Sequence, residues 1–262
     1  MRERTDDDRR GVLRTPPPEA FALRRWDPSP ALAPFAAFHW AVEWDLRGRG
    51  QHTQVTLAHP AAHLVVEKGQ TRFYGPARRR FERVLRGRDR AVATRLTPAG
   101  ARALLGRPVA SVADRFVDAR GLGLDLAAAV ADLPLDAAVA TLDEALCDVL
   151  PDRPDPGAQL AARALALLEE DRALTRVGEL ARALGVSSRS LQRLFADHVG
   201  VPPAEVARRL RLQEAAAAAT SGEPVDWARL AAELGYCDQA HLVRDFTAAV
   251  GTPPARYAAA GA

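Results

Sequence analysis

A stripe of apolar residues at helical spacing, closed by a glycine, occurs twice between residues 176 and 257. In each copy, leucine and alanine recur every three or four positions up to the glycine, and a second apolar stripe follows it. Glycine is favoured there because a helix often ends in a left-handed backbone conformation. Gly185 corresponds to Gly235 at an offset of 50 residues, and Arg193 corresponds to Arg244 at an offset of 51. A duplicated helix-turn-helix with one residue added at the second turn is the simplest structure with this pattern.

The second helix of each copy is predicted to carry donor-rich side chains on its polar face. Ser187 is placed to cap this helix in the first copy, and Asp226 is placed to cap the preceding helix of the second copy. Arginine and glutamine pair bidentately with guanine and adenine edges in the major groove of DNA. The sequence therefore predicts two reading helices in one chain. Their outward residues are Arg189, Gln192 and Arg193 in the first copy and Gln239, His241 and Arg244 in the second.

An alanine-rich segment from Pro203 to about Gly222 joins the copies and is predicted to be a helix that fixes their separation. Together with this connector, the stretches 185–195, 234–241 and 244–246 resemble the DNA-binding domain of AraC-type transcriptional regulators. The resemblance covers the C-terminal part of the chain and needs both units and the connector together. It implies that the two reading helices enter successive major grooves on one face of the duplex.

Charge adds little to this interpretation. From Leu160 to the C-terminus the chain has twelve arginines and twelve acidic residues, so a positive face must come from segregation of the charges. Arg208 and Arg209 of the connector are expected to contact DNA phosphates, which would make binding strongly salt-dependent. The net neutrality favours one alternative, a protein-binding adaptor whose helix pairs no longer read DNA.

The composition is that of a folded protein with two domains. The chain has 262 residues, of which 48% are hydrophobic and 26% are charged, and its formal net charge is +3. Two cysteines, Cys147 and Cys237, are too few for a disulfide framework or a zinc site, which favours a reducing cytoplasm. The sequence contains neither a signal-like N-terminal segment nor an apolar run of the ~20 residues that a membrane span needs. We therefore expect a cytoplasmic protein without a membrane partner.

The N-terminal half reads differently. Residues 1–20 are charged and interrupted by prolines, which is typical of a disordered tail. Residues 21–150 are expected to form a β-rich effector or association domain with a helical C-terminal part. Its strand signals are the alternation of Phe38, Trp40, Val42 and Trp44 with His39, Ala41 and Glu43, and further short segments at 54–57, 64–66, 71–74 and 91–94.

Two histidines and a carboxylate, His59, His63 and Glu67, lie at a spacing of four in this region. Even spacing places side chains on one face of a strand, and these are metal-ligand types, so a cupin-like metal-dependent enzyme is a second alternative. Against it, Pro60 interrupts the segment and the His-x-His pair of metal cupins is missing. We expect no metal, cofactor or catalytic residue, and instead expect the three residues to line an effector pocket with Trp40 and Trp44. His39 and His52 are interpreted as surface or pocket residues.

Arginines crowd the segment from Arg78 to Arg90 around Phe81, Val84 and Leu85. The pattern fits an amphipathic hairpin with solvated arginines, and an acidic effector or a subunit contact is the alternative. The stretch Thr97–Gly106 is expected to be a turn and a short helix, and helical periodicity returns from Leu124 to Leu150. His59 to Glu67, Tyr74-Gly75, Thr97–Gly106 and Asp114-Arg115 resemble the N-terminal domain of a subgroup of the same regulators, which implies a cupin-like sensory or oligomerisation module.

The sequence thus predicts an α+β chain of two domains: a β-rich, cupin-like N-terminal barrel with covering helices, and an all-α C-terminal domain with two helix-turn-helix units. Residues 151–157 are expected to be a linker, and residues 158–262 the DNA-binding domain. The predicted function is sequence-specific transcriptional regulation without enzymatic activity. Double-stranded DNA is the expected partner, and a small-molecule effector, RNA polymerase and a second copy of the chain are candidates.

Overall fold

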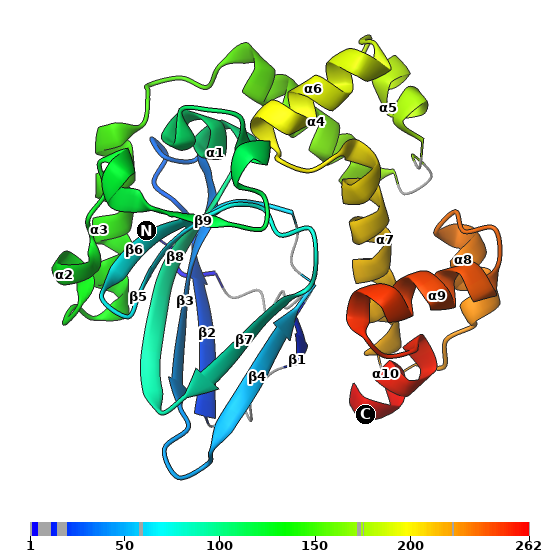
Figure 1. Cartoon of the computed structure of the whole chain (residues 1–262), viewed down its shortest axis with the longest axis horizontal. Coiled ribbons are helices and arrows are strands. Elements are labelled where there is room, and N and C mark those ends of the chain that lie inside the picture. The colour runs from blue at the N-terminus through cyan, green and yellow to red at the C-terminus, as the bar shows by residue number, and fades with distance from the viewer. Residues whose placement is uncertain are drawn as a thin grey trace.

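The computed structural model describes residues 2–4, 12–14, 20–57, 60–171, 174, 176–221 and 223–261, and all structural statements refer to these. A β-rich N-terminal part with covering helices is followed by an all-α C-terminal part, as the sequence predicts (Figure 1). Within the described residues, no helix combines the length and apolar character that crossing a membrane requires.

Two antiparallel sheets build the N-terminal part. The six-stranded sheet has the order β2-β3-β8-β5-β6-β9, and the three-stranded sheet has the order β1-β4-β7. Strand β3 pairs with β2 on one side and β8 on the other, so it lies inside the larger sheet. The strands are β1 Val12–Arg14, β2 Phe21–Trp26, β3 Ala36–Asp45, β4 Gln51–Thr56, β5 His63–Glu67, β6 Gln70–Tyr74, β7 Phe81–Arg86, β8 Arg88–Leu96 and β9 Phe116–Asp118.

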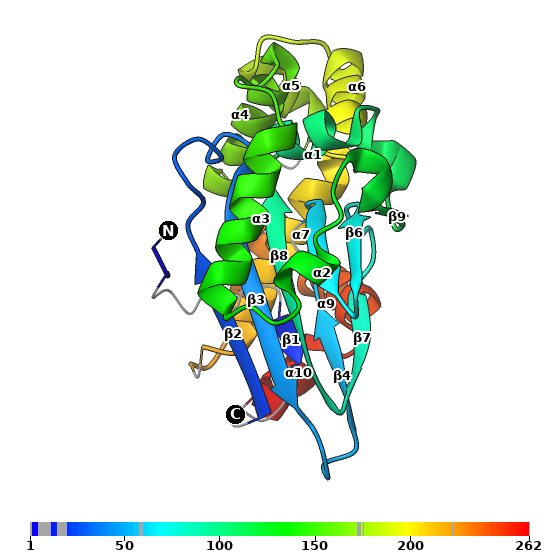
Figure 2. The ribbon, with the colours of Figure 1, turned by 90° about the vertical axis from the view of Figure 1, so that its left-hand side faces the viewer.

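One face of the larger sheet is covered by helices. The long helix α3, Leu135–Val149, packs across β3 and β8 on this face (Figure 2). Its leucines join Trp26, Leu64 and Phe73 in the main core of the N-terminal part. Strand β3 is therefore not half-exposed as its alternation suggests, because His39 and Ala41 are buried under this helix. The remaining N-terminal helices are α1 Pro98–Leu105, α2 Ala127–Val130, and the 3-10 helices η2 Val109–Val112 and η3 Ala119–Leu122.

The arginine-rich segment does not form the expected hairpin. Strands β7 and β8 follow each other across Gly87, whose φ is +59°, but β7 pairs with β4 while β8 pairs with β3 and β5. The chain therefore passes from one sheet to the other at this glycine. Alternation predicts a strand, but the partner of that strand is set by segments far away in the sequence.

Two expected boundaries differ in detail. Within the segment 1–20, where a tail is expected, Glu3 forms a bridge with Trp26, and strand β1 pairs with β4. Residues 1, 5–11 and 15–19 lie outside the described part of the chain. The expected linker ends early, because Asp155 accepts a hydrogen bond from the backbone of Ala158 at 2.9 Å and caps a helix that begins at Pro156.

Seven helices form the C-terminal part that the structure describes. Helix α7 stands beside the β-rich part and joins two helical units, the first at its start and the second at its end (Figure 1). Each unit has its own apolar core, centred on Leu191 and Phe195 in the first and on Leu242 and Phe246 in the second. The helices are α4 Pro156–Glu170, α5 Val177–Ala183, α6 Ser188–His198, α7 Pro203–Ala219, α8 Trp227–Glu233, α9 Gln239–Val250 and α10 Pro254–Gly261.

Candidate nucleic-acid interface and ligand cavity

The first helical unit positions α6 by a glycine turn and a cap. Gly185 has a φ of +68° and ends the preceding helix, and the Ser187 hydroxyl accepts a hydrogen bond from the backbone of Ser190 at 3.1 Å. Leu191 and Phe195 are fully buried against α4, α5 and α7. The opposite face of α6 is consequently exposed. It carries Arg189, Gln192 and Arg193.

The second unit repeats this design with one more residue in the turn. The carboxylate of Asp226 caps α8 by accepting from the backbones of Ala228 and Arg229, each at 3.0 Å. A cap that the sequence reading missed, Asp238, accepts from the backbone of His241 at 2.6 Å and starts α9. It lies three residues after Gly235, whereas Ser187 lies two after Gly185, which locates the added residue. The exposed face of α9 carries Gln239, His241 and Arg244.

Tyr236 and Asp245 fix the orientation of α9. The Tyr236 hydroxyl donates to Asp245 Oδ2 at 2.9 Å, and Arg208 of α7 donates to Asp245 Oδ1 at 2.7 Å. The edge of the His241 ring contacts the Tyr236 ring, with centroids 5.1 Å apart. The hydrogen bond to Asp245 raises the pKa of Arg208. Helix α9 is thus attached to the connector by a charged hydrogen bond as well as by apolar packing.

Arg208 and Arg209, which are expected to contact phosphates, both have partners within the protein. Arg208 is engaged by Asp245. The Arg209 side chain is 4% exposed and donates to the backbone carbonyls of Ala77 and Arg78 in the N-terminal part. Burial lowers the pKa of its guanidinium. A buried guanidinium whose N–H groups are taken by carbonyls is not available for a DNA phosphate in this conformation.

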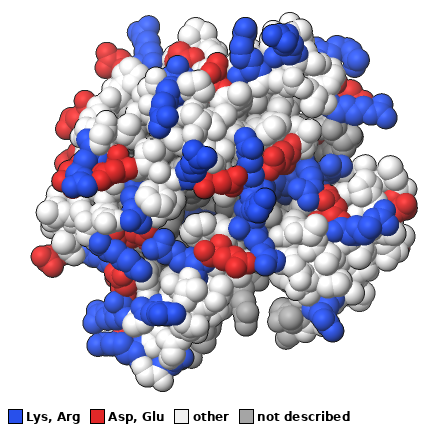
Figure 3. Space-filling view, viewed as in Figure 1, with Lys and Arg blue, Asp and Glu red and all other residues white. Residues whose placement is uncertain are grey.

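Basic side chains are distributed unevenly on the surface. In Figure 3 they gather along the upper edge, over α5 and α6, and again at the lower left, over the ends of the strands, whereas arginines and carboxylates are interspersed between these regions. The exposed arginines of the first unit include Arg182 in α5 and Arg189 and Arg193 in α6. Segregation of this kind is what a neutral domain needs to present a positive face to DNA.

A cavity of about 790 Å³ lies between the larger sheet, strands β4 and β7, and helix α7. Trp40, Trp44, His63 and Glu67 line it, so the structure brings together four of the five residues expected in an effector pocket. The fifth, His59, lies outside the described residues. Helix α7 supplies part of the wall, which makes the cavity a feature of both parts of the chain. The α7 residues are Leu210, Gln213, Glu214 and Ala217.

Polar groups in the cavity wall bind one another. Tyr74 donates its hydroxyl hydrogen to Glu67 Oε1 at 2.8 Å, and Arg83 contacts Glu67 Oε2 at 2.7 Å. Trp40 donates to His63 Nδ1 at 3.1 Å. Glu67 and His63 therefore have partners that a metal would have to displace. Among the residues that the structure describes, no three His, Cys, Asp or Glu side chains are grouped as metal ligands.

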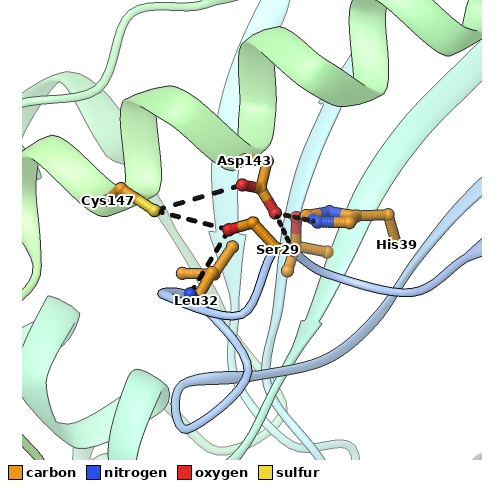
Figure 4. Close-up of polar contacts among 6 residues, drawn as sticks. Ser29, Leu32, His39, Asp143 and Cys147 are labelled. Carbon is orange, nitrogen blue, oxygen red and sulfur yellow. Dashed lines mark hydrogen bonds and ion pairs between the residues drawn. The ribbon is translucent and has the colours of Figure 1, made fainter. Parts of the chain in front are cut away.

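A buried polar network joins β3 to α3, and sequence reasoning did not find it (Figure 4). His39, interpreted above as a surface or pocket residue, is 0% exposed. Its Nε2 lies 3.0 Å from Asp143 Oδ2 and its Nδ1 lies 2.8 Å from the Thr94 hydroxyl. Asp143 also accepts from the backbone of Ser29 at 2.9 Å. An ionised Asp143 needs a donor, so Nε2 carries the proton and Nδ1 accepts from Thr94.

The two ionisable groups in this network are shifted by opposing causes. Burial lowers the pKa of His39, although its hydrogen bond to Asp143 acts in the opposite direction. Burial acts to raise the pKa of Asp143, but the hydrogen bonds from Ser29 and His39 outweigh it and lower the pKa overall. The network is a neutral histidine beside a carboxylate, enclosed by the fold, and its role is to hold α3 on the sheet.

Comparison with known families gives one match in each part of the chain. A family model described as a helix-turn-helix domain matches residues 180–260, and a model described as a domain of unknown function matches residues 24–118. The first match covers α6, α7 and α9, with both capping turns. No curated protein matches the sequence.

Solved structures give weak overall similarity. An AraC-type transcriptional regulator from Chromobacterium violaceum is 23% identical over 41% of this chain and 97% of its own, with a TM-score of 0.37. ToxT from Vibrio cholerae is 11% identical over 91% of this chain and 98% of its own, with a TM-score of 0.39. ToxT with a bound unsaturated fatty acid is 10% identical over 91% and 95%, with a TM-score of 0.41. The two capped units, their connector and the family match together show that residues 180–260 are a helix-turn-helix domain.

Proposed function

We propose that the chain is a sequence-specific transcriptional regulator that reads DNA with α6 and α9. The observation that carries this proposal is the repeated arrangement of exposed donors over a buried stripe. In each helix, apolar residues fix the helix against its unit, and arginine and glutamine point away from it. Side chains of these types, held on a rigid helix, suit hydrogen bonding to base edges in the major groove.

The connector suits two contacts on one face of the duplex. Helix α7 has 17 residues, and at 1.5 Å per residue it is about 25 Å long. Successive major-groove segments on one face lie ~34 Å apart, which is of the same order as the length of α7. We therefore expect a site with two elements one helical turn apart. Since each element is read by a different helix, the site does not have to be palindromic.

The cavity is proposed as the site of a small-molecule effector. Its volume falls within the ~300–1,000 Å³ that ligand pockets occupy, and aromatic residues supply much of its wall. A molecule bound there would contact the β-rich part and α7 together. Binding would thereby influence the helix that carries both reading units.

This function has consequences for partners and location. A regulator acts on transcription without catalysis of its own, so RNA polymerase is a natural partner and a second copy of the chain is another candidate. Such a protein works in the compartment that holds the DNA, which favours the cytoplasm.

The decisive experiment is selection of the purified chain against a random duplex library, followed by a salt titration on the selected duplex. We expect a motif with two elements one turn apart, and an affinity that falls steeply with salt concentration because phosphates are neutralised. The control is the double variant Arg193→Ala/Arg244→Ala, which should fail to enrich the motif. Selection of no motif by the folded wild-type chain would reject DNA reading and leave the adaptor as the better explanation.

A further inference from the structure

The core of the second helix-turn-helix unit contains a residue of the N-terminal part. Leu57, directly after β4, is 2% exposed and belongs to the same buried apolar cluster as Leu212 of α7, Ala231 of α8 and Phe246 of α9. Its backbone carbonyl accepts a buried hydrogen bond from Gln213 Nε2 at 2.8 Å. The core of the second unit therefore includes a side chain from the N-terminal part of the chain. Leu57 lies 156 residues before its hydrogen-bond partner Gln213.

Further contacts attach the same unit to the same region. Arg80 Nη1 donates to the carbonyl of Val250, the last residue of α9, at 3.0 Å. The next residue, Gly251, has a φ of +88° and approaches Arg80 so closely that a Cβ atom would lie 2.0 Å from Nη1. The left-handed backbone that ends α9 favours glycine there, and a side chain at this position would also displace the end of the flexible Arg80 side chain. On α7, one turn before Gln213, the buried guanidinium of Arg209 donates to the backbone carbonyls of Ala77 and Arg78 in the N-terminal part.

The first unit is built differently. Its apolar core, among the described residues, is made of side chains from Ala161 to Leu210, all from the C-terminal part. It touches the N-terminal part at its outside, where Gly200 lies against Pro76 and Val109. The N-terminal part is consequently a neighbour of the first unit but a component of the second.

Gln213 lies between Leu57, in the core of the second unit, and the cavity. The side chain is 8% exposed, and it lines the cavity while its amide nitrogen holds the Leu57 carbonyl. A primary amide has two N–H donors. Leu57 accepts from one of them, so an acceptor in the cavity that reached the other would bind Gln213 without displacing Leu57.

We propose that the cavity binds an aromatic molecule carrying a hydrogen-bond acceptor, and that this molecule tightens the second reading unit by bonding to Gln213 and so securing Leu57 in its core. The inference rests on the proposed function, because it assigns a ligand class and a regulatory action to the proposed effector site. An acceptor on the ligand orients the amide and strengthens its bond to Leu57. Ligand binding and ordering of α8 and α9 are then one equilibrium.

The chemistry of the walls supports this ligand class. The carboxylate of Glu67 already has Tyr74 and Arg83 as partners, so it does not require a polar group from the ligand. Aromatic rings on the strands line the cavity and suit a planar molecule, and the guanidinium groups of Arg25 and Arg95 lie over the Phe38 ring. These rings belong to Phe21, Phe38, Trp40, Trp44, Tyr74 and Phe81.

Hydrogen exchange of the full chain tests the contact itself. Leu57→Ala should speed exchange of the α8 and α9 amides at least about tenfold and leave α5 and α6 at their wild-type rates. The matched control is Leu64→Ala, a truncation in the main N-terminal core. It should not change the ratio of the exchange rates of α8 and α9 to those of α5 and α6. The milder Leu57→Val should show the same selectivity if Leu57→Ala fails to fold. Equal effects of Leu57 truncation on both units, or none on either, would overturn the proposal.

A pair of neutral probes tests the ligand. The naphthyl ketone 6-propionyl-2-(dimethylamino)naphthalene has an acceptor, and N-phenyl-1-naphthylamine has a similar aromatic body without a carbonyl. The ketone should slow exchange of α8 and α9 about tenfold at ten times its dissociation constant. Gln213→Leu should weaken ketone binding about three- to tenfold and leave the amine unaffected. Faster or unchanged exchange with bound ketone, or equal weakening of both probes, would contradict the assignment.

Failure of this inference and failure of the proposed function give different results. If the chain selects a two-element DNA motif but the exchange rates of α8 and α9 respond neither to Leu57 truncation nor to the ketone, the chain is a regulator without this coupling. A chain that shows the coupling but selects no DNA motif retains the ligand response and loses the proposed function.

Discussion

At the scale of residues, the reading faces depend on which side of each helix is buried. Leu191 and Phe195 in α6, and Leu242 and Phe246 in α9, have no exposed surface, so the polar residues of these helices face outward. This orientation follows from the helical period alone. It could therefore be predicted from the sequence, and the same reasoning identifies the side chains whose removal should alter specificity.

Arg193→Ala and Arg244→Ala should each weaken binding to the selected duplex by ~1–3 kcal/mol, because in the proposed function each arginine donates to base edges in one element of the site. Titration against duplexes with single base changes checks this, since each variant should become indifferent to bases in one element only. Arg182→Ala, an exposed arginine on α5, is the control and should retain the wild-type preferences. A uniform loss on every duplex would instead identify the arginine as a phosphate contact.

His39 should make stability depend on pH. Its pKa in the fold lies below its ordinary value of 6.5 because it is buried, so the unfolded chain binds its proton first as the pH falls. The contribution of His39 to the free energy of unfolding should therefore be independent of pH above about 6.5 and should decline as the pH falls below it. His39→Gln should flatten the decline between pH 7 and pH 5 in denaturant titrations, whereas His241→Gln, on the exposed face of α9, should not. Identical slopes for wild type and His39→Gln would contradict this.

At the scale of elements, helix ends were easier to predict than strand partners. Ser187 and Asp226 cap helices where the sequence places them, because a cap depends on residues within one turn. Asp238 corresponds to Ser187 at the offset of 51 residues that follows the added turn residue, so this cap could have been predicted from the duplicated pattern as well. The pairing of β7 with β4 was missed because strand alternation contains no information about a distant partner.

Asp238→Ala should destabilise the start of α9 by about 1 kcal/mol, because the backbone N–H of His241 loses its acceptor. Hydrogen exchange of the first-turn amides of α9 should accelerate. The variant should also lose more of its affinity for the second DNA element than for the first. Ser187→Ala is the matched variant and should produce the reverse pattern through α6. If Asp238→Ala affected both elements alike, the two units would not read DNA independently.

At the scale of the whole molecule, the two-part layout was predictable and the contact between the parts was not. Strand alternation was enough to place Trp40, Trp44, His63 and Glu67 around one cavity. Their partners Arg83 and Tyr74, and the α7 wall, come from separate segments that no local pattern joins. Arg209 illustrates the same limit, because an arginine on a connector helix is expected to face solvent, and only the folded chain buries it against Ala77 and Arg78.

Arg209→Met distinguishes a buried contact from a phosphate contact. Methionine retains apolar bulk but leaves the carbonyls of Ala77 and Arg78 without their donor, so the free energy of unfolding should fall by ~1–3 kcal/mol. The slope of log affinity against log salt should stay at the wild-type value, because no phosphate loses its counter-charge. An arginine bound to a phosphate would lower that slope by about 1. Salt titrations of Arg209→Met and wild type on the same duplex decide between the two, and a reduced slope would show that the junction opens when the chain binds DNA.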